Sequence, residues 1–211
     1  MTPSLTLILG GARSGKSDYA QRLAADRGRP VIYLATAAPI ASQFDPEMAE
    51  RIAAHRQSRP ADWQTVEEPI EIVDAITRRA RPNDVVVVDC LTLWVSNVCL
   101  AAFGGEAEGE AETVSAERWR SLETAIISRT ESLLNAAAAK RLALILISNE
   151  VGLGVVPAFP LGRHYRDLLG RVNQAVARNA DHVILMLAGL PIDLRRIALT
   201  PSPFDRDKDF P

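Results

Sequence analysis

A glycine-rich segment near the start of the chain has the residue types and spacing of a phosphate-binding loop. GGARSGKS fits the pattern G-x-x-x-x-G-K-[ST], with Gly10, Gly15, Lys16 and Ser17 at its fixed positions. Successive backbone N–H groups of such a loop, together with the positive end of the following helix, bind phosphate oxygens. The lysine reaches the β- and γ-phosphates, and the serine hydroxyl is a ligand for Mg²⁺. The motif therefore predicts that the chain binds a nucleoside triphosphate.

An acidic residue that can complete a metal site follows another apolar run. In VVVVDC, Asp89 comes directly after four valines. A carboxylate at the end of a buried strand holds Mg²⁺ directly or through water in P-loop enzymes. Without the loop, such an aspartate would as readily be an ordinary strand end; with the loop, the metal role is favoured.

The kind of P-loop protein is narrowed by what the sequence lacks. A GTPase switch carries an N-K-x-D-type guanine reader after a late strand, whereas this chain has SNEVG, with Glu150 in place of the lysine. We find no ABC-type signature and no basic, aromatic-rich segment typical of helicases. For a chain of 211 residues, elimination favours a small-molecule kinase or a nucleotidyltransferase.

The chain has three histidines that could act as nucleophiles. His182 adjoins an apolar run and is predicted to be structural, whereas His164 lies in LGRHYRD and can contact an anion or solvent. His55 differs because three arginines surround it: Arg51, Arg56 and Arg59. However, Met48, Ile52 and His55 share one helix face by their spacing, so periodicity alone favours a half-buried structural histidine.

The elements that must position these residues follow from the apolar pattern. Five apolar runs have the length of strands: 5–9, 31–35, 85–89, 142–148 and 183–188. They are continuous, as in strands covered on both faces. Helical patterns lie between them: 16–28, 45–59, 70–80, 90–103, 116–139 and 161–180. The alternation predicts right-handed crossovers and an α/β, P-loop NTPase-type three-layer fold with a mostly parallel central sheet.

Composition and charge limit the classes of protein to which the chain can belong. With 47% hydrophobic residues, 24% charged residues and a net charge of −2, the chain is typical of soluble proteins, with no general affinity for nucleic acid or acidic membranes. Cys90 and Cys99 have no metal-site spacing and are predicted to be reduced, buried thiols. No signal or membrane span is evident, so we expect a cytoplasmic protein without stable membrane insertion. We expect one domain over 1–211, with a mobile acidic connection at 104–117 and a tail from about 200 to 211.

Six segments, in order, resemble one known family. They are GGARSGKS, YLATA, MAERIAAHRQSRPADWQTVEEP, VVVVDCLTLWVSN, SNEVGLGVVP and RHYRDLLGRVNQAVARNADHV. Over residues 5–190 the chain is similar to the bifunctional adenosylcobinamide kinase/adenosylcobinamide-phosphate guanylyltransferases of cobalamin biosynthesis. The resemblance implies a homotrimer and two reactions. In the first, ATP or GTP phosphorylates the aminopropanol hydroxyl of adenosylcobinamide. In the second, GTP guanylylates an enzyme histidine, and GMP passes to adenosylcobinamide phosphate, giving adenosylcobinamide-GDP.

Carried over by position, the family's guanylylated histidine falls on His55, which joins Lys16 as a catalytic residue. The metal ligands are Ser17 and Asp89. The implied nucleotide contacts are Gly10, Gly11, Ala12, Arg13, Ser14, Gly15, Lys16, Ser17, Ala35, Thr36, Ala37, Arg56, Gln57, Ser58, Arg59, Glu67 and Asp89. Two departures from the family pattern stand out: Ala54 stands where some relatives have a second histidine, and Asp89 stands where some relatives have a glutamate.

The chemistry of these residues agrees with the resemblance but leaves alternatives open. A neutral imidazole is a competent nucleophile at an α-phosphate, and neighbouring arginines can neutralise the leaving pyrophosphate. With one P-loop, both reactions are expected to share a single triphosphate site. NEVGLGVVP with RHYRD is the candidate corrinoid region, beyond the carboxyl end of a parallel strand. The alternatives are a monofunctional small-molecule kinase in which His55 is structural, and a nucleotide-dependent regulatory module, against which the missing N-K-x-D element counts.

Overall fold

The computed structural model describes residues 3–37, 59–103 and 114–199. Of the predicted helix 45–59, only Arg59 lies within these ranges. That helix, the predicted tail and most of the acidic connection therefore stay predictions.

All seven strands of the described residues belong to one sheet. They are β1 (Ser4–Gly10), β2 (Val31–Ala35), β3 (Gln64–Glu67), β4 (Val85–Asp89), β5 (Ala143–Ile147), β6 (His182–Leu187) and β7 (Leu190–Asp193). Their order across the sheet is β3-β2-β4-β5-β1-β6-β7. Every neighbouring pair is parallel except β6 with β7. The predicted α/β fold with a mostly parallel sheet is confirmed.

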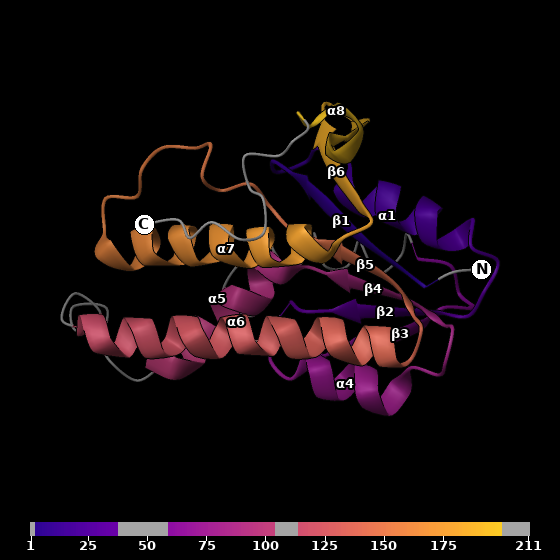
Figure 1. Ribbon diagram of the computed structural model, residues 1–211, viewed down its shortest axis with the longest axis horizontal. Coiled ribbons are helices and arrows are strands. Elements are labelled where there is room, and N and C mark those ends of the chain that lie inside the picture. The colour runs from indigo at the N-terminus through magenta and orange to yellow at the C-terminus, as the bar shows by residue number, and fades with distance from the viewer. Residues whose placement is uncertain (1–2, 38–58, 104–113, 200–211) are drawn as a thin grey trace.

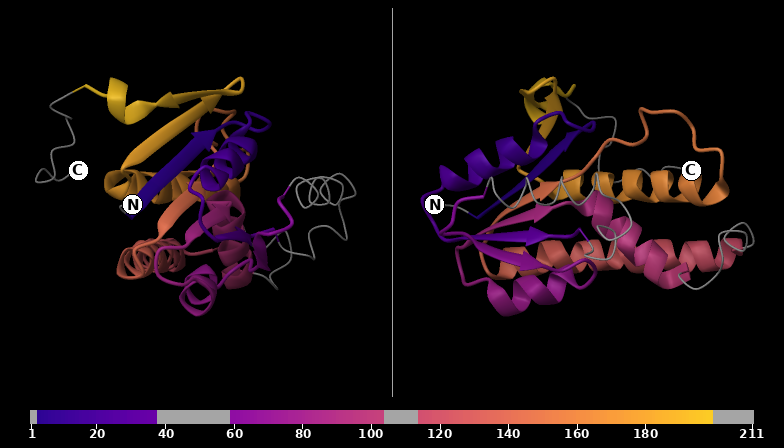
Figure 2. Two further views of the ribbon diagram at one scale, coloured as in Figure 1. Left: turned by 90° about the vertical axis from the view of Figure 1, so that its right-hand side faces the viewer. Right: turned by 180° about the vertical axis from the view of Figure 1, so that it is seen from behind.

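Helices cover both faces of this sheet, as Figures 1 and 2 show. They are α1 (Lys16–Ala25), α4 (Ile72–Arg79), α5 (Leu91–Phe103), α6 (Ala116–Ala139), α7 (Pro160–Asn179) and the short α8 (Leu194–Ile197). Local signals set two of the starts. The Ser115 side chain caps α6 by accepting from the Arg118 N–H at 3.3 Å, and Pro160 opens α7, where its missing N–H leaves no helical bond unmade.

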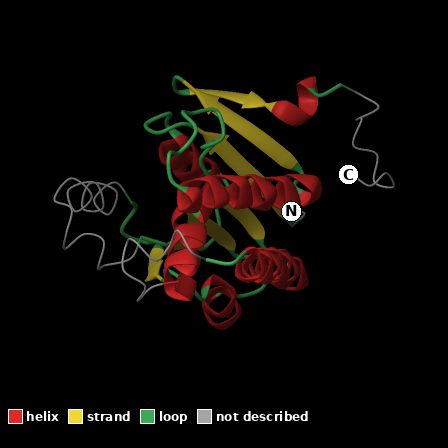
Figure 3. Ribbon diagram, turned by 90° about the vertical axis from the view of Figure 1, so that its left-hand side faces the viewer, coloured by secondary structure: helices red, strands yellow, loops and turns green. Residues whose placement is uncertain are grey.

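The core consists of two apolar layers, one on each face of the sheet. Alternate strand residues such as Ile8, Tyr33 and Val87 pack with α1. The residues between them, such as Leu34 and Val88, pack with α4, α5, α6 and α7. Figure 3 looks at the molecule from the side, with one long helix running across the strands. The strands read as continuous apolar runs because both of their faces are covered.

The five predicted strands are all present, with bounds that shift by at most one residue. The strands β3 and β7 and the helix α8 were not predicted. In β3 only Val66 is half-buried, and β7 is an antiparallel edge strand that contains Pro191. Among the described residues, no helix is long and apolar enough to cross a membrane.

Candidate nucleotide-binding site

The carboxyl ends of five parallel strands meet at one edge of the sheet. The register aligns Ile8 of β1 with Ile147 of β5, Ile147 with Asp89 of β4, Asp89 with Ala35 of β2, and Ala35 with Glu67 of β3. The connections that follow these strands therefore start at the same level. This is the edge at which ligands bind in open α/β sheets.

The glycine-rich loop leaves β1 at Gly10 in a conformation that excludes other residues. A Cβ atom at Gly10 would lie 2.5 Å from the carbonyl oxygen of Met186 on β6, and the φ angle of Gly10 is 150°. Gly15, directly before α1, has a φ of 89°, and its carbonyl accepts the first helical bond from the Tyr19 N–H at 3.0 Å. Glycine is thus required at both ends of the loop, as the motif predicted.

Bonds from neighbouring segments fix the loop. The Gly189 N–H, in the turn after β6, donates to the Ser14 carbonyl at 3.2 Å. The ammonium group of Lys16 donates to the Gly11 carbonyl at 2.5 Å, so the lysine side chain folds back over the loop. A phosphate held by the loop would lie beside this ammonium group.

Ser17 and Asp89 meet next to the loop. The Ser17 hydroxyl donates to Asp89 Oδ2 at 3.0 Å, and the Tyr33 hydroxyl donates to the same oxygen. A hydroxyl and a carboxylate are ligands that Mg²⁺ prefers. No group of three or more His, Cys, Asp or Glu able to hold a metal occurs in the described residues, so phosphates and water would complete the shell. The donor set fits a magnesium ion bound with nucleotide.

Tyr33 lies in the middle of β2 and is fully buried. Burial raises the pKa of its hydroxyl, and the adjacent Asp89 carboxylate raises it further. The hydroxyl therefore stays protonated and remains a donor to Asp89. The sequence placed Tyr33 in an apolar run but assigned it no role, although a buried tyrosine hydroxyl requires a partner.

Arg59 lies over the same tyrosine. Its guanidinium carbon is 4.0 Å from the centre of the Tyr33 ring, and the Trp63 ring stacks on Tyr33 at 6.3 Å between centroids. The Arg59 Nε and Nη1 atoms are buried without a hydrogen-bond partner among the described residues. His55, Arg56, Gln57 and Ser58 lie outside the described residues.

Thr36 joins the ends of β2 and β4. Its hydroxyl donates to the Cys90 carbonyl at 2.8 Å and accepts from the Cys90 N–H at 2.7 Å, and its N–H donates to the Asp89 carbonyl at 2.9 Å. Asn97 of α5, which the sequence had not marked, donates to the Thr36 carbonyl at 2.7 Å. The backbone around Asp89 is thereby fixed, while Ala37 follows half-buried.

Two histidines lie apart from this cluster. Glu67 is exposed at the end of β3, paired in register with Ala35 of β2 and four strand spacings from β1, or roughly 19 Å. His164 stacks on Trp119 at 4.5 Å between ring centroids. His182 places Nδ1 3.5 Å from the Asp193 carboxylate, in keeping with its predicted structural role.

Hydrogen bonds to α7 and to the phosphate-binding loop hold the start of the segment that follows β5. Asn173 of α7, only 5% exposed, donates from Nδ2 to the Asn149 carbonyl at 3.2 Å and to Glu150 Oε1 at 3.4 Å. The Glu150 N–H in turn donates to the Gly10 carbonyl at 3.3 Å. Further along, large apolar side chains are exposed: Leu153 by 85%, Val155 by 94% and Phe159 by 70%. This candidate corrinoid region therefore starts beside the phosphate-binding loop.

Both cysteines are free thiols, as predicted; Cys99 is also buried as predicted, whereas Cys90 is only half-buried. Burial raises the pKa of each to about 11. At neutral pH both are protonated, and neither has the properties of a nucleophile.

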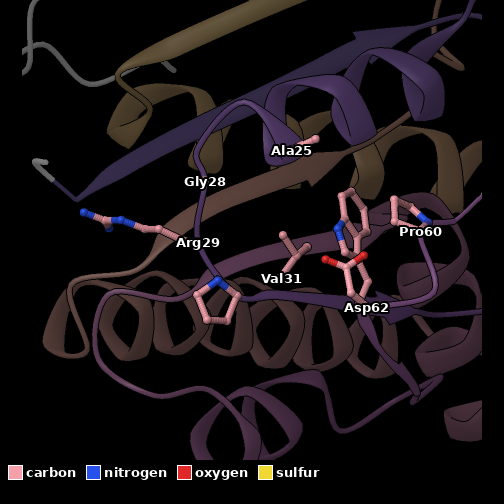
Figure 4. A pocket seen from close by; sticks show the side chains of 8 residues that line it. Ala25, Gly28, Arg29, Val31, Pro60 and Asp62 are labelled. Carbon is pink, nitrogen blue, oxygen red and sulfur yellow. The ribbon is translucent and has the colours of Figure 1, made fainter.

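A hollow of about 590 Å³ lies elsewhere, between the end of α1 and the segment before β3 (Figure 4). Its walls include Arg29, Val31 and Asp62. Since Val31 is the first residue of β2, the hollow lies toward the opposite edge of the sheet from the loop. None of the predicted nucleotide contacts lines it.

Comparison with known proteins identifies the family. The profile of the CobU family, described as cobinamide kinase / cobinamide phosphate guanyltransferase, matches residues 6–194. The chain belongs to the CobU family. The bifunctional adenosylcobalamin biosynthesis protein CobP of Pseudomonas aeruginosa is 41% identical over 189 residues, which are 90% of this chain and 96% of that protein. The proteins named CobU of Escherichia coli K12 and Salmonella typhimurium LT2 are each 38% identical over 191 residues, 90% of this chain and 99% of theirs.

The family predicted from the six motifs is thus confirmed for this CobU-family chain. Among solved structures, the RadB recombinase is similar with a TM-score of 0.46 and 16% identity, covering 87% of this chain and 74% of that one. The assignment of the fold rests on the sheet order and the loop described above.

Proposed function

We propose that this chain is a bifunctional enzyme of adenosylcobalamin biosynthesis. It phosphorylates adenosylcobinamide with a nucleoside triphosphate, and it transfers GMP from GTP to adenosylcobinamide phosphate, giving adenosylcobinamide-GDP. One observation carries the proposal: a phosphate-binding loop whose Ser17 lies 3.0 Å from the Asp89 carboxylate, in a chain that matches the family over residues 6–194.

In the kinase reaction, the loop and Lys16 hold the triphosphate. Backbone N–H groups of the loop and the first turn of α1 bind the phosphates, and the Lys16 ammonium group moves from the Gly11 carbonyl to the β- and γ-phosphates. Mg²⁺, held by Ser17 and Asp89, would neutralise the charge that develops on the transferred group. The aminopropanol hydroxyl attacks the γ-phosphorus, and the nucleoside diphosphate leaves.

In the guanylyl transfer, His55 is the nucleophile. Its imidazole nitrogen attacks the α-phosphorus of GTP, the bond to the bridging oxygen breaks, and pyrophosphate leaves. The resulting phosphoramidate is then attacked by a phosphate oxygen of adenosylcobinamide phosphate, which frees the histidine. The buried, unpartnered Nε and Nη1 atoms of Arg59, four residues after His55 in the chain, support a role in binding phosphate oxygens.

The acceptor is proposed to bind over the segment after β5. Leu153, Val155 and Phe159 are exposed there, and the segment begins at Glu150, whose N–H donates to Gly10. Exposed apolar side chains beside a polar site are typical of a surface for a large ligand with apolar faces. An acceptor seated there would direct its hydroxyl toward the loop.

Four further points remain predictions from the resemblance and the motifs. They are the homotrimer, the cytoplasmic location, the need for Mg²⁺, and the nucleotide contacts of Ala35, Ala37 and Glu67. The alternative activity, a monofunctional kinase with a structural His55, shares the same loop and metal residues.

The proposal is tested by identifying products. The purified chain is incubated with adenosylcobinamide, Mg²⁺ and both ATP and GTP. The corrinoids are then separated and identified by mass spectrometry. We expect adenosylcobinamide phosphate first and adenosylcobinamide-GDP later. Accumulation of the phosphate alone, with GTP in excess, would support the monofunctional kinase, and an unchanged corrinoid would contradict both activities.

A further inference from the structure

We propose that Tyr33 is a positioning residue shared by both reactions: its hydroxyl holds the Asp89 carboxylate beside Ser17, and its ring holds Arg59. The inference rests on the proposed function and adds a residue to it. Tyr33 is the first residue of the segment YLATA, but it is not among the nucleotide contacts that the resemblance implies, and no role was assigned to it.

The hydroxyl half of the inference follows from the hydrogen bonds of Asp89. Both the Ser17 hydroxyl and the Tyr33 hydroxyl donate to Asp89 Oδ2. Two donors to Oδ2 restrict the rotation of the Asp89 carboxylate, so the other oxygen, Oδ1, points in a fixed direction. Groups that orient a metal-binding carboxylate in this way contribute to metal affinity without touching the metal.

The ring half follows from the stacking of Arg59. An arginine 4.0 Å from the centre of an aromatic ring is held by its delocalised charge and keeps its N–H groups free for other acceptors. Here the Nε and Nη1 atoms are buried without a partner among the residues described. Buried donors of this kind are costly unless an acceptor arrives. The tyrosine ring therefore keeps a phosphate-binding group in place.

A purely structural role accounts for neither feature. The neighbouring core residues of the same sheet face, such as Val87 and Ile147, are aliphatic, and a phenylalanine would fill the volume of Tyr33 without a buried hydroxyl. The hydroxyl instead bonds to Asp89, the carboxylate to which Ser17 also donates. Through the Asp89 carboxylate, Tyr33 also connects Ser17 of the P-loop to Arg59, which lies four residues after His55 in the sequence.

The first experiment isolates the hydroxyl. Tyr33→Phe keeps the ring and removes the oxygen, and Tyr19→Phe is the matched control because Tyr19 packs on the same sheet face. Binding of Mn²⁺, used in place of Mg²⁺, is titrated by electron paramagnetic resonance in the presence of a non-hydrolysable GTP analogue. We expect the Mn²⁺ dissociation constant to rise roughly tenfold in Tyr33→Phe and to change less than about twofold in the control. A rise of less than about threefold in Tyr33→Phe overturns the hydroxyl half.

The second experiment isolates the ring. Tyr33→Met removes the aromatic face while a flexible side chain fills the space. Arg59→Ala is then made in the Tyr33→Phe and Tyr33→Met backgrounds, and the rate of protein labelling by α-labelled GTP is measured at saturating Mg²⁺. We expect Arg59→Ala to slow labelling about tenfold or more where the ring is present and less than about threefold where it is absent. Equal losses in both backgrounds contradict the ring half.

Two controls separate this inference from the proposed function. Asp89→Asn in the Mn²⁺ titration tests the metal site itself. If Asp89→Asn weakens Mn²⁺ binding and Tyr33→Phe does not, the inference on Tyr33 fails alone. If neither variant changes Mn²⁺ binding, the proposed metal role of Asp89 fails with it. Thermal unfolding of each variant confirms that the protein tested is folded.

Discussion

Replacing Gly10 with alanine is expected to destabilise both the fold and the nucleotide site. The added Cβ would lie 2.5 Å from the Met186 carbonyl oxygen and 2.7 Å from Ser14 Oγ. Ser14 can rotate, but the carbonyl belongs to the backbone of β6, so β1 and β6 must separate locally. The φ of 150° adds strain for any residue with a side chain.

The size of the effect follows from these two terms. Overpacking costs about 1–3 kcal/mol, and an unfavourable backbone angle costs about 1 kcal/mol more, so we expect a loss of about 2–4 kcal/mol. For a chain of 211 residues, this corresponds to a fall in Tm of roughly 5–15 °C. Nucleotide affinity should fall as well, because the loop starts at the displaced residue.

Gly11→Ala is the matched control for this experiment. A Cβ at Gly11 meets no described atom within 4 Å, so the Tm should change by less than about 2 °C. Both variants are unfolded thermally while circular dichroism is recorded, and GTP binding is measured by calorimetry at 25 °C or below. A Tm for Gly10→Ala within about 2 °C of the unsubstituted protein would refute the steric argument. An equal fall in both variants would do the same.

Three further predictions concern charge and protonation. Lys16→Ala should slow both phosphorylation and guanylyl transfer at least about 10²-fold, because the same phosphate-binding loop orients the triphosphate in each reaction. Separate assays of the two reactions measure this effect, and near-normal activity in either one contradicts the single-site proposal. Asp89→Asn should raise the Mg²⁺ concentration needed for half-maximal activity more than it weakens nucleotide binding, and an unchanged Mg²⁺ curve would leave Asp89 a structural strand end. Burial raises the pKa of Cys99 from 9.0 to about 11, so folding favours its protonated form; this contribution to stability is present below pH 9 and is lost as the pH rises toward 11. Between pH 8 and 10.5 the Tm should therefore fall less in Cys99→Ala than in the unsubstituted protein, and equal falls would contradict the assignment.

The sheet was predictable because its central strands are covered on both faces. A run such as VVVV before Asp89 has few alternatives to a buried strand. The strand β3 was missed because three of its four residues are exposed, so it has no apolar pattern. The strand β7 was missed because Pro191, its second residue, indicated the end of a strand. An edge strand tolerates proline.

The site was predictable where a motif names its residues and unpredictable where packing makes the contact. The loop pattern identified Lys16 and Ser17, and the strand end identified Asp89. Tyr33 could not be found this way, because its role depends on β2 lying beside β4, which aligns its hydroxyl with Asp89. The stacking of Arg59 on that ring depends on the path of the chain between β2 and β3, which no local pattern specifies.

Labelling of the protein by GTP tests the central claim most directly. The unsubstituted chain and its His55→Ala, His164→Ala and His182→Ala variants are incubated with α-labelled and, separately, γ-labelled GTP and Mg²⁺. The proposed mechanism predicts acid-labile, base-stable label from α-labelled GTP only, with pyrophosphate released, and its loss in His55→Ala alone while kinase activity persists in part. Label that survives in His55→Ala, or label that enters from γ-labelled GTP, would contradict the assignment of His55 as the guanylyl carrier.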